Sequence, residues 1–161
     1  MKAITLRPPW GWAVLNGKSP ENRTRNIAGS YRGPLVIHQG KRPIPVNDPG
    51  RDLILHLTGR LLLAEHPRTL GAALGIADLV DVHVCRRSTT HGHQGQPVCF
   101  DDHTPIGLLC SPWAQYDDAG EIHHLALRNP RWFPEPIPYR GALGLWQFPN
   151  ELLPEGFRDA S

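Results

Sequence analysis

The sequence predicts an α+β domain built around a small mixed β-barrel. Its 161 residues include 17 prolines and 16 glycines, more than a helical bundle tolerates, because proline interrupts helices and both residues favour turns. Five or six short stretches have the apolar patterns of strands, whereas only two have the pattern of a helix. The two types do not alternate regularly along the chain, which favours a barrel over a doubly wound parallel sheet.

The first elements surround a polar segment near the N-terminus. Residues 4–6 are typical of a short strand, and Pro8-Pro9 suits the first turn of a helix over residues 10–15. Asn16-Gly17 ends this helix, since glycine readily adopts the left-handed conformation found after helices. The alternating polar residues of 18–25 then predict a strand with one solvated face.

A buried strand and a second helix are predicted next. Residues 35–38 are β-branched and apolar, as in a buried strand. Asp52 is a candidate cap for a helix that ends near Pro67. Gly59 lies inside this stretch and weakens its helical pattern.

Residues 72–84 predict a long strand that contains two aspartates. Asp78 and Asp81 are unusual inside such an apolar run. They indicate either exposure on one face or a β-bulge.

The second half of the chain is less regular. Residues 85–120 form a polar excursion rich in His, Gly and Asp, and residues 122–127 return to a strand pattern. Residues 130–138 contain four prolines, which predicts an extended connection. Residues 143–148 are typical of a final strand.

Charge is distributed unevenly although the net charge is only +2. Residues 1–42 hold eight Lys and Arg against one Glu, whereas residues 81–161 hold six against ten acids. A basic end is compatible with an anionic ligand or a nucleic acid on one face. It is equally compatible with the uneven surface charge of any small protein.

Membrane and export segments are not expected. No stretch approaches 18 apolar residues, and the N-terminus lacks the apolar core of a signal peptide.

The chain has three cysteines, Cys85, Cys99 and Cys110. An odd number without an export signal predicts reduced thiols in a cytoplasmic protein.

Residues 17–23, with the sequence GKSPENR, resemble the signature of the ASCH domain, a member of the PUA-like superfamily. In that pattern a glycine stands beside a lysine, a glutamate follows three residues later, and an arginine follows two beyond that. Further segments are similar to bacterial and phage members in the same order, namely Pro9-Trp10 and residues 31–38, 74–79, 111–114 and 141–146. The resemblance spans residues 1–149 as one domain and leaves 150–161 as a C-terminal tail. It is poor over residues 41–70 and over residues 85–109, which form most of the excursion at 85–120.

The resemblance implies a PUA-like β-barrel with flanking helices, a cleft over the barrel mouth, and RNA or nucleotide-related ligands. Some similar members are reported as ribonucleases or as hydrolases of modified nucleosides. In the members that resemble amidohydrolases, a threonine nucleophile stands three residues after the lysine. Glu21 occupies that position here, and Thr24 lies on the opposite face of the predicted strand, so a Thr/Lys nucleophile pair is not supported.

Lys18, Glu21 and Arg23 are the candidate ligand-binding residues. Lys18 is one of only three lysines and suits a phosphate contact, or a base if burial lowers its pKa. Glu21 suits a contact to an exocyclic amine, or general-base catalysis if the chain is an enzyme. Arg23 suits a forked contact to phosphate. The alternative is a structural ion pair among these residues.

Three tryptophans complete the predicted ligand-binding set. Trp10, Trp12 and Trp113 could stack on bases, as aromatic side chains do in single-strand binding proteins. The alternative is core packing, which is common for tryptophan. Because Trp10 and Trp12 cannot share a helix face, we expect one in the core and one at the cleft.

The excursion also contains potential zinc ligands. They are Cys85, His91, His93, Cys99, His103 and Cys110. Their spacing matches no zinc finger or ribbon, and no C-x-x-C is present. Solvated histidine-bearing loops are the simpler interpretation, so neither a metal nor another cofactor is predicted.

The sequence therefore predicts a cytoplasmic domain that binds RNA, a nucleoside or a nucleotide in a basic cleft, with no membrane partner. One alternative is a hydrolase that acts on RNA or a modified nucleoside in the same cleft. A second alternative is a protein-interaction module that docks through residues 130–138. The ligand, catalysis and the oligomeric state are left open.

Overall fold

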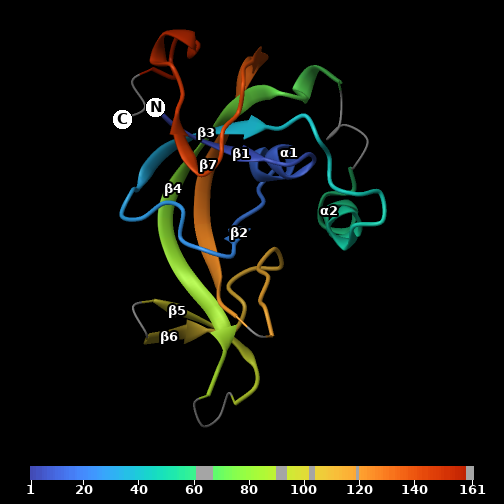
Figure 1. Ribbon diagram of the computed structural model, residues 1–161, viewed down its shortest axis with the longest axis vertical. Helices are drawn as coiled ribbons and strands as arrows, with labels where there is room; N and C mark the ends of the chain where they lie inside the picture. The colour runs from blue at the N-terminus through green and yellow to red at the C-terminus, as the bar shows by residue number, and fades with distance from the viewer. Residues whose placement is uncertain (61–66, 90–93, 102–103, 119, 159–161) are drawn as a thin grey trace.

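The computed structural model describes residues 1–60, 67–89, 94–101, 104–118 and 120–158. Strands dominate these residues and form a curled, half-barrel sheet that two α-helices accompany (Figure 1). The prediction of an α+β domain, mostly strands with flanking helices, is confirmed. The elements in chain order are β1 (Lys2–Leu6), α1 (Trp10–Leu15), β2 (Glu21–Arg23), β3 (Gly33–Gln39), α2 (Pro49–Thr58), η2 (Pro67–Thr69), β4 (Ala72–Arg87), β5 (Pro97–Asp101), β6 (Thr104–Gly107), β7 (Ile122–Pro138), β8 (Leu145–Gln147) and η3 (Asn150–Leu152).

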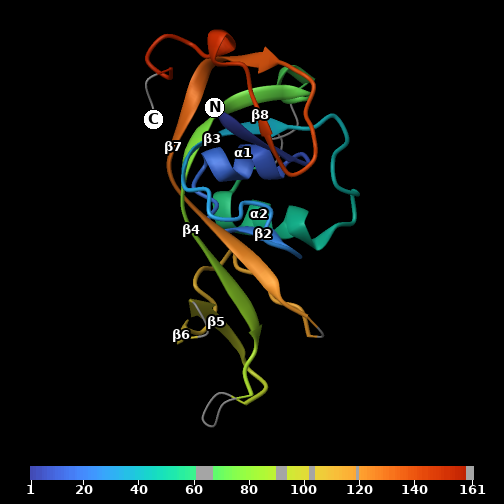
Figure 2. The same ribbon diagram turned by 60° about the vertical axis from the view of Figure 1, so that its left-hand side comes forward.

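The main sheet has the strand order β2-β7-β4-β3-β1-β8. Strands β1 and β3 are parallel, and the other paired strands are antiparallel. β5 pairs with the C-terminal part of β4, and β6 pairs with β5. The predicted irregular excursion therefore contains the end of β4 and a further hairpin, and both Figure 1 and Figure 2 place this hairpin at the end of β4 far from β8.

Irregular pairing between β4 and β7 curls the sheet. The register shifts three times, and two of these shifts adjoin Asp78 and Asp81, the positions where the sequence predicted exposure on one face or a β-bulge. Figure 2 shows both strands curving together along the molecule. At Gly75 the strands approach so closely that a Cβ atom would lie 2.2 Å from the carbonyl oxygen of Arg131. A glycine is therefore required at this crossing.

Strand β7 continues through the proline-rich segment that the sequence predicts as a connection. The segment is extended as expected, but it pairs with β4 as far as Pro138. β2 covers only residues 123–125 of β7, so the following residues form an edge. The amide of Tyr139 faces the β4 side and donates to the Gly71 carbonyl at 3.1 Å. Pro138, one residue earlier, therefore places its missing N–H group toward the open edge, and Pro134 and Pro136 lie where the β4–β7 register shifts.

Helix α1 confirms the predicted helix at residues 10–15. Gly17 follows with a φ of 95°, and the amide of Lys18 donates to the Ala13 carbonyl at 2.9 Å. This left-handed turn reverses the chain and places Lys18 beneath the helix.

The predicted start of the second helix at Asp52 is wrong. Helix α2 begins at Pro49, because the side chain of Asp48 caps it by accepting from the Gly50 amide at 2.8 Å. It ends at Thr58, where Gly59 adopts a φ of 66°. The rest of the predicted helix falls largely on residues 61–66, outside the described residues.

Apolar side chains cover both faces of the sheet. Leu35 and Ile37 of β3 belong to a cluster that packs under α1, whereas Val36 points to a second cluster on the other face. A third cluster joins α1 to α2 and contains Trp12, Ala13, Ile54 and Trp113.

The expected C-terminal tail packs against the domain as far as the structure describes it. Leu153 and Phe157 join the second apolar cluster, and the N-terminal ammonium of Met1 donates to the Phe148 carbonyl at 3.1 Å. The N-terminus thus lies next to the start of this segment, where its ammonium also donates to Oδ1 of Asn150. Within the described residues, no helix is both long and apolar enough to cross a membrane.

Candidate functional site

Lys18, Glu21 and Arg23 form one ion-pair network. The Lys18 Nζ lies 2.7 Å from Oε2 of Glu21, and Nη2 of Arg23 lies 3.2 Å from Oε1 of the same carboxylate. The Lys18 side chain is 2% exposed, whereas that of Arg23 is 30% exposed. Glu21 therefore links a buried cation to a partly solvated one.

The Lys18 ammonium has two further partners. It donates to the Pro20 carbonyl at 2.8 Å and lies 5.2 Å from the ring centroid of Trp10. A desolvated ammonium needs such partners, because an unpaired buried charge is strongly unfavourable. The network therefore fixes the chain between α1 and β2.

The three residues meet in one network but border two different hollows. Lys18 and Glu21 line a small pocket of about 190 Å³. Its lining consists of Trp10, Lys18, Glu21, Asn22, Asp48 and Gln115. Arg23 instead lines a larger hollow on the other side of Glu21.

The larger hollow continues into a second one and forms a groove. The two have volumes of about 720 and 670 Å³ and share the lining residues Thr5, Gly40, Lys41 and Gly141. Volumes of this order accommodate nucleotide-sized ligands.

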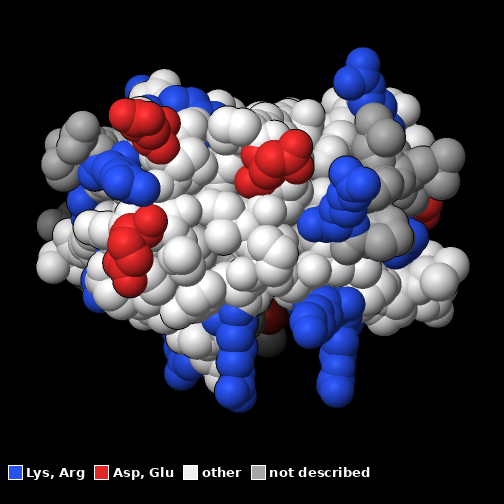
Figure 3. Space-filling view, turned by 90° about the horizontal axis from the view of Figure 1, so that it is seen from above, with Lys and Arg blue, Asp and Glu red and all other residues white. Residues whose placement is uncertain are grey.

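Five cationic side chains line this groove, which we call the basic groove: Arg7, Arg23, Lys41, Arg42 and Arg140. No Asp or Glu is among the described residues that line it. Of the five, Arg23 alone has a carboxylate of a described residue within ion-pair distance. Figure 3 views the molecule from above Figure 1 and shows Lys and Arg side chains projecting together from its lower edge.

The floor of the basic groove is closely packed. A Cβ atom on Gly141 would lie 2.5 Å from Oγ1 of Thr5 and 2.7 Å from Cε1 of His38. The ring of Tyr139, another lining residue, stacks on Trp146 with centroids 5.7 Å apart. The cavity therefore depends on glycine at position 141.

His38 is a buried neutral residue of this floor. Burial lowers its pKa, although a hydrogen bond to the Tyr139 carbonyl opposes the shift. Nε2 makes that bond at 3.0 Å, which assigns the ring proton to Nε2. Nδ1 of His38 and Nε of Arg23 are buried and have no hydrogen-bond partner among the described residues. The groove thus contains one unpaired acceptor and one unpaired donor.

The structure separates the three predicted tryptophans. Trp12 and Trp113 are buried in the cluster between α1 and α2, where their rings serve packing. Trp10 is partly exposed and lines the small pocket. As expected, one of the two helix tryptophans, Trp12, lies in the core, and the other, Trp10, lies at a pocket.

A second constellation lies at the β5–β6 end of the sheet. His83, Cys99, Cys110 and His124, which we call the Cys/His cluster, place their side-chain N and S atoms within 4.8 Å of one another. Nε2 of His83 lies 3.2 Å from Sγ of Cys110. Nδ1 of His124 lies 3.3 Å from the same sulfur and 3.7 Å from Sγ of Cys99.

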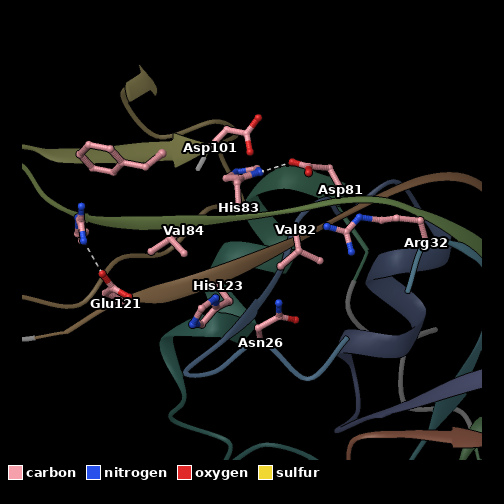
Figure 4. A pocket seen from close by; sticks show the side chains of 11 residues that line it. Asn26, Arg32, Asp81, Val82, His83, Val84, Asp101, Glu121 and His123 are labelled. Atoms are coloured by element: carbon pink, nitrogen blue, oxygen red, sulfur yellow. Dashed lines mark hydrogen bonds and ion pairs between the residues drawn. The ribbon is translucent and has the colours of Figure 1, made fainter. Parts of the chain in front are cut away.

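Each histidine of the cluster is oriented by a partner on its other nitrogen. Nδ1 of His83 donates to Oδ2 of Asp81 at 2.8 Å, and Figure 4 shows this pair on one side of β4, in a hollow of about 400 Å³. Nε2 of His124 donates to the Gln115 carbonyl at 2.7 Å. Both rings therefore turn their other nitrogen toward the two sulfurs, and a hydrogen bond with Cys99 is the largest cause that raises the pKa of His83.

The three thiols differ in their acidity. Hydrogen bonds lower the pKa of Cys99, first from Cys110 and then from His124 and His83. Burial raises the pKa of Cys85. The pKa of Cys110 is raised, chiefly by its hydrogen bond to Cys99.

Only part of the sequence-derived zinc set meets in the structure. Cys99 and Cys110 belong to the cluster, whereas Cys85 is buried and does not join it. His91, His93 and His103 lie outside the described residues. The sequence-derived set of potential ligands included neither His83 nor His124. The signal that identifies both is their direct pairing across β4 and β7, which spacing alone does not reveal.

No family model matches the chain. The ASCH resemblance therefore stays a prediction that rests on the motifs.

Proposed function

We propose that this chain is an ASCH-type domain with a PUA-like barrel, and that its basic groove binds RNA or a nucleotide-like ligand through phosphate groups. The observation that supports the proposal is the groove lining of five cations without a described acid. Four of these cations have no described carboxylate partner, so a polyanion can neutralise them.

Arg23 connects the motif to the groove. Glu21 holds its guanidinium from one side, and Lys18 holds Glu21. A guanidinium fixed in this way loses little further entropy when it binds a phosphate. In this proposal Arg23 and the groove cations contact the ligand, whereas Lys18 and Glu21 position Arg23.

The groove also offers an aromatic contact for a base. The half-buried ring of Tyr139 lines it, and an aromatic face stacks on any base. Nδ1 of His38 is buried beneath this floor, so it is not among the proposed ligand contacts.

The test is binding of a fluorescent single-stranded RNA, followed by anisotropy at several salt concentrations. If the four unpaired cations each neutralise one phosphate, log K against log salt should have a slope of about −3, since each contact to a single strand contributes about −0.7. Lys41→Ala and Arg140→Ala should each weaken binding and make the slope shallower by about 0.7.

The matched control is Arg128→Ala, because Arg128 is exposed and does not line the groove. Its affinity and slope should equal those of the parent chain. Absent or salt-independent binding to RNA, nucleosides and nucleotides would refute the proposal. If Arg128→Ala and Lys41→Ala lose equal RNA affinity, the binding is a non-specific attraction to surface charge and not a property of the groove.

A hydrolase is the second candidate. The specific observation in its favour is the small pocket, where a buried ammonium and the Glu21 carboxylate adjoin Asp48. Long incubation with total RNA and with acylated nucleosides, followed by mass analysis, should yield products that Glu21→Gln abolishes. Unchanged substrates after incubation with the parent chain would eliminate this candidate for both substrate classes.

The third hypothesis, docking through the proline-rich part of β7, stays a prediction. If it is correct, a pull-down should capture a protein partner, and the Lys18→Ala variant should bind that partner equally well.

A further inference from the structure

The Cys/His cluster has the dimensions of a four-coordinate metal site. Zinc binds sulfur at about 2.3 Å and imidazole nitrogen at about 2.0–2.1 Å, so the edges of its coordination tetrahedron measure roughly 3.4–3.8 Å. The three N···S distances in the cluster are 3.2, 3.3 and 3.7 Å. Three of the six edges are thus within about 0.2 Å of tetrahedral separations, and the four ligand atoms all lie within 4.8 Å of one another.

The partners of both histidines are those expected around a metal. Ligating histidines usually donate their second N–H to a carboxylate or a backbone carbonyl, which fixes the ring and its tautomer. Asp81 and the Gln115 carbonyl fill these two roles. The orientation of both imidazoles is therefore set independently of their contacts with the thiols.

The four ligands come from four separate segments. His83 lies on β4, Cys99 on β5, His124 on β7, and Cys110 in the loop after β6. His83 and His124 face each other across the ladder. A shared ion would cross-link the strand ends to a loop that otherwise belongs to no sheet.

The types of ligand indicate which metal binds and whether the site is structural or catalytic. Two thiolates with two imidazoles suit zinc, and four protein ligands leave no open position for substrate. A thiol nucleophile is the rival interpretation, because Cys110, His83 and Asp81 are linked as in a catalytic triad. However, Sγ of Cys110 also contacts His124, which the triad does not require and a metal site does.

The loop that begins at Cys110 reaches the small pocket. The Asn22 side chain donates to the Trp113 carbonyl at 2.9 Å and accepts from the Gln115 amide at 3.1 Å. Gln115 lines the small pocket, and its carbonyl also holds His124. Fixing Cys110 and His124 therefore fixes one wall of that pocket.

We propose that His83, Cys99, Cys110 and His124 bind one zinc ion as a closed structural site that holds the loop of residues 108–118 against the sheet. The inference is independent of RNA binding, because none of the four residues lines the basic groove.

The first test is the metal content of the purified full-length chain after dialysis, measured by mass spectrometry of the elements. About one zinc per chain is expected. Cys99→Ala and His124→Gln should lose it, whereas the neighbouring substitutions Cys85→Ala and His123→Gln should retain it. Cobalt should replace zinc and give the visible bands of tetrahedral Co²⁺ with thiolate charge transfer.

The second test does not depend on the folding of ligand variants. Asp81 is 44% exposed, so Asp81→Asn should fold while it weakens the orientation of His83. In competition with a chromogenic chelator, its zinc affinity should fall roughly 10–100-fold. Asp78→Asn, which changes the other bulge aspartate of β4, should leave the affinity unchanged.

Three results would overturn the proposal. The first is a folded chain that takes up no zinc in the competition assay. The second is a Cys99–Cys110 disulfide in the chain purified without reductant. The third is rapid alkylation of Cys110 that depends on His83 and is insensitive to added zinc, which would assign the thiol nucleophile instead.

Discussion

Glu21→Gln removes the negative charge between Lys18 and Arg23 while it preserves the shape of the side chain. The Lys18 ammonium is 2% exposed and keeps only the Pro20 carbonyl and the Trp10 ring as partners. Breaking a buried pair so that one charge is left uncompensated costs about 3–5 kcal/mol. For a chain of this length, each kcal/mol shifts Tm by roughly 2–4 °C, so Tm should fall by roughly 6–20 °C.

The assay is thermal unfolding followed by circular dichroism, with urea unfolding as a second measure. Two further variants separate the two halves of the network. Arg23→Gln breaks only the partly solvated pair and should cost about 0–1 kcal/mol. Lys18→Met combined with Glu21→Gln removes both buried charges and should be more stable than Glu21→Gln alone.

The reasoning fails if Glu21→Gln changes the free energy of unfolding by less than about 0.5 kcal/mol, the size of an ordinary surface effect. It also fails if the double substitution is as destabilising as the sum of its parts. Either result would mean that Lys18 is solvated and that the network does not position Arg23.

Three other substitutions test the fold. Gly75→Ala places a Cβ atom 2.2 Å from the Arg131 carbonyl oxygen and should destabilise the chain by at least about 1–3 kcal/mol in urea unfolding. Asp48→Ala removes the cap on the Gly50 amide and should cost about 1 kcal/mol, with lower helix content by circular dichroism. Because burial lowers the pKa of His38, its stabilising contribution is complete above the unfolded pKa of about 6.5 and is lost as the pH falls below it. His38→Gln should therefore lose less stability than the parent chain between pH 7 and pH 5, and identical losses would contradict the assignment.

Local chemistry made much of the fold predictable. Gly17 ends α1 through a left-handed turn as predicted, and the aspartates within an apolar strand lie next to register shifts. Gly59 also ends a helix in this way, although the sequence pattern predicted that the helix would continue to Pro67. The start of α2 was misplaced because two aspartates, Asp48 and Asp52, were available as caps. Only Asp48 precedes a proline that suits the first helical position. The full length of β7 was missed because strand pairing overrides proline's local preference at an edge. The end of β4 was missed because residues 85–87 are held in the sheet by their pairing with β5.

The candidate sites were predictable only where their residues are neighbours in sequence. The spacing of Glu21 and Arg23 placed both on one strand face, and the structure joins them. The basic groove instead gathers Arg7, Lys41 and Arg140 from three distant segments. The Cys/His cluster depends on the register of β4 against two other strands. Neither arrangement follows from spacing along the chain, because non-local pairing determines it.

The C-terminal prolines of β7 limit how the open side of this strand can associate. Another chain can lengthen a sheet only where the last strand supplies amide protons at every second residue. Positions 134, 136 and 138 supply none, so that flank resists both fibre-like stacking and capture of an extended peptide. Any protein that recognises it must do so through the pyrrolidine rings and the neighbouring side chains, as a surface of fixed shape.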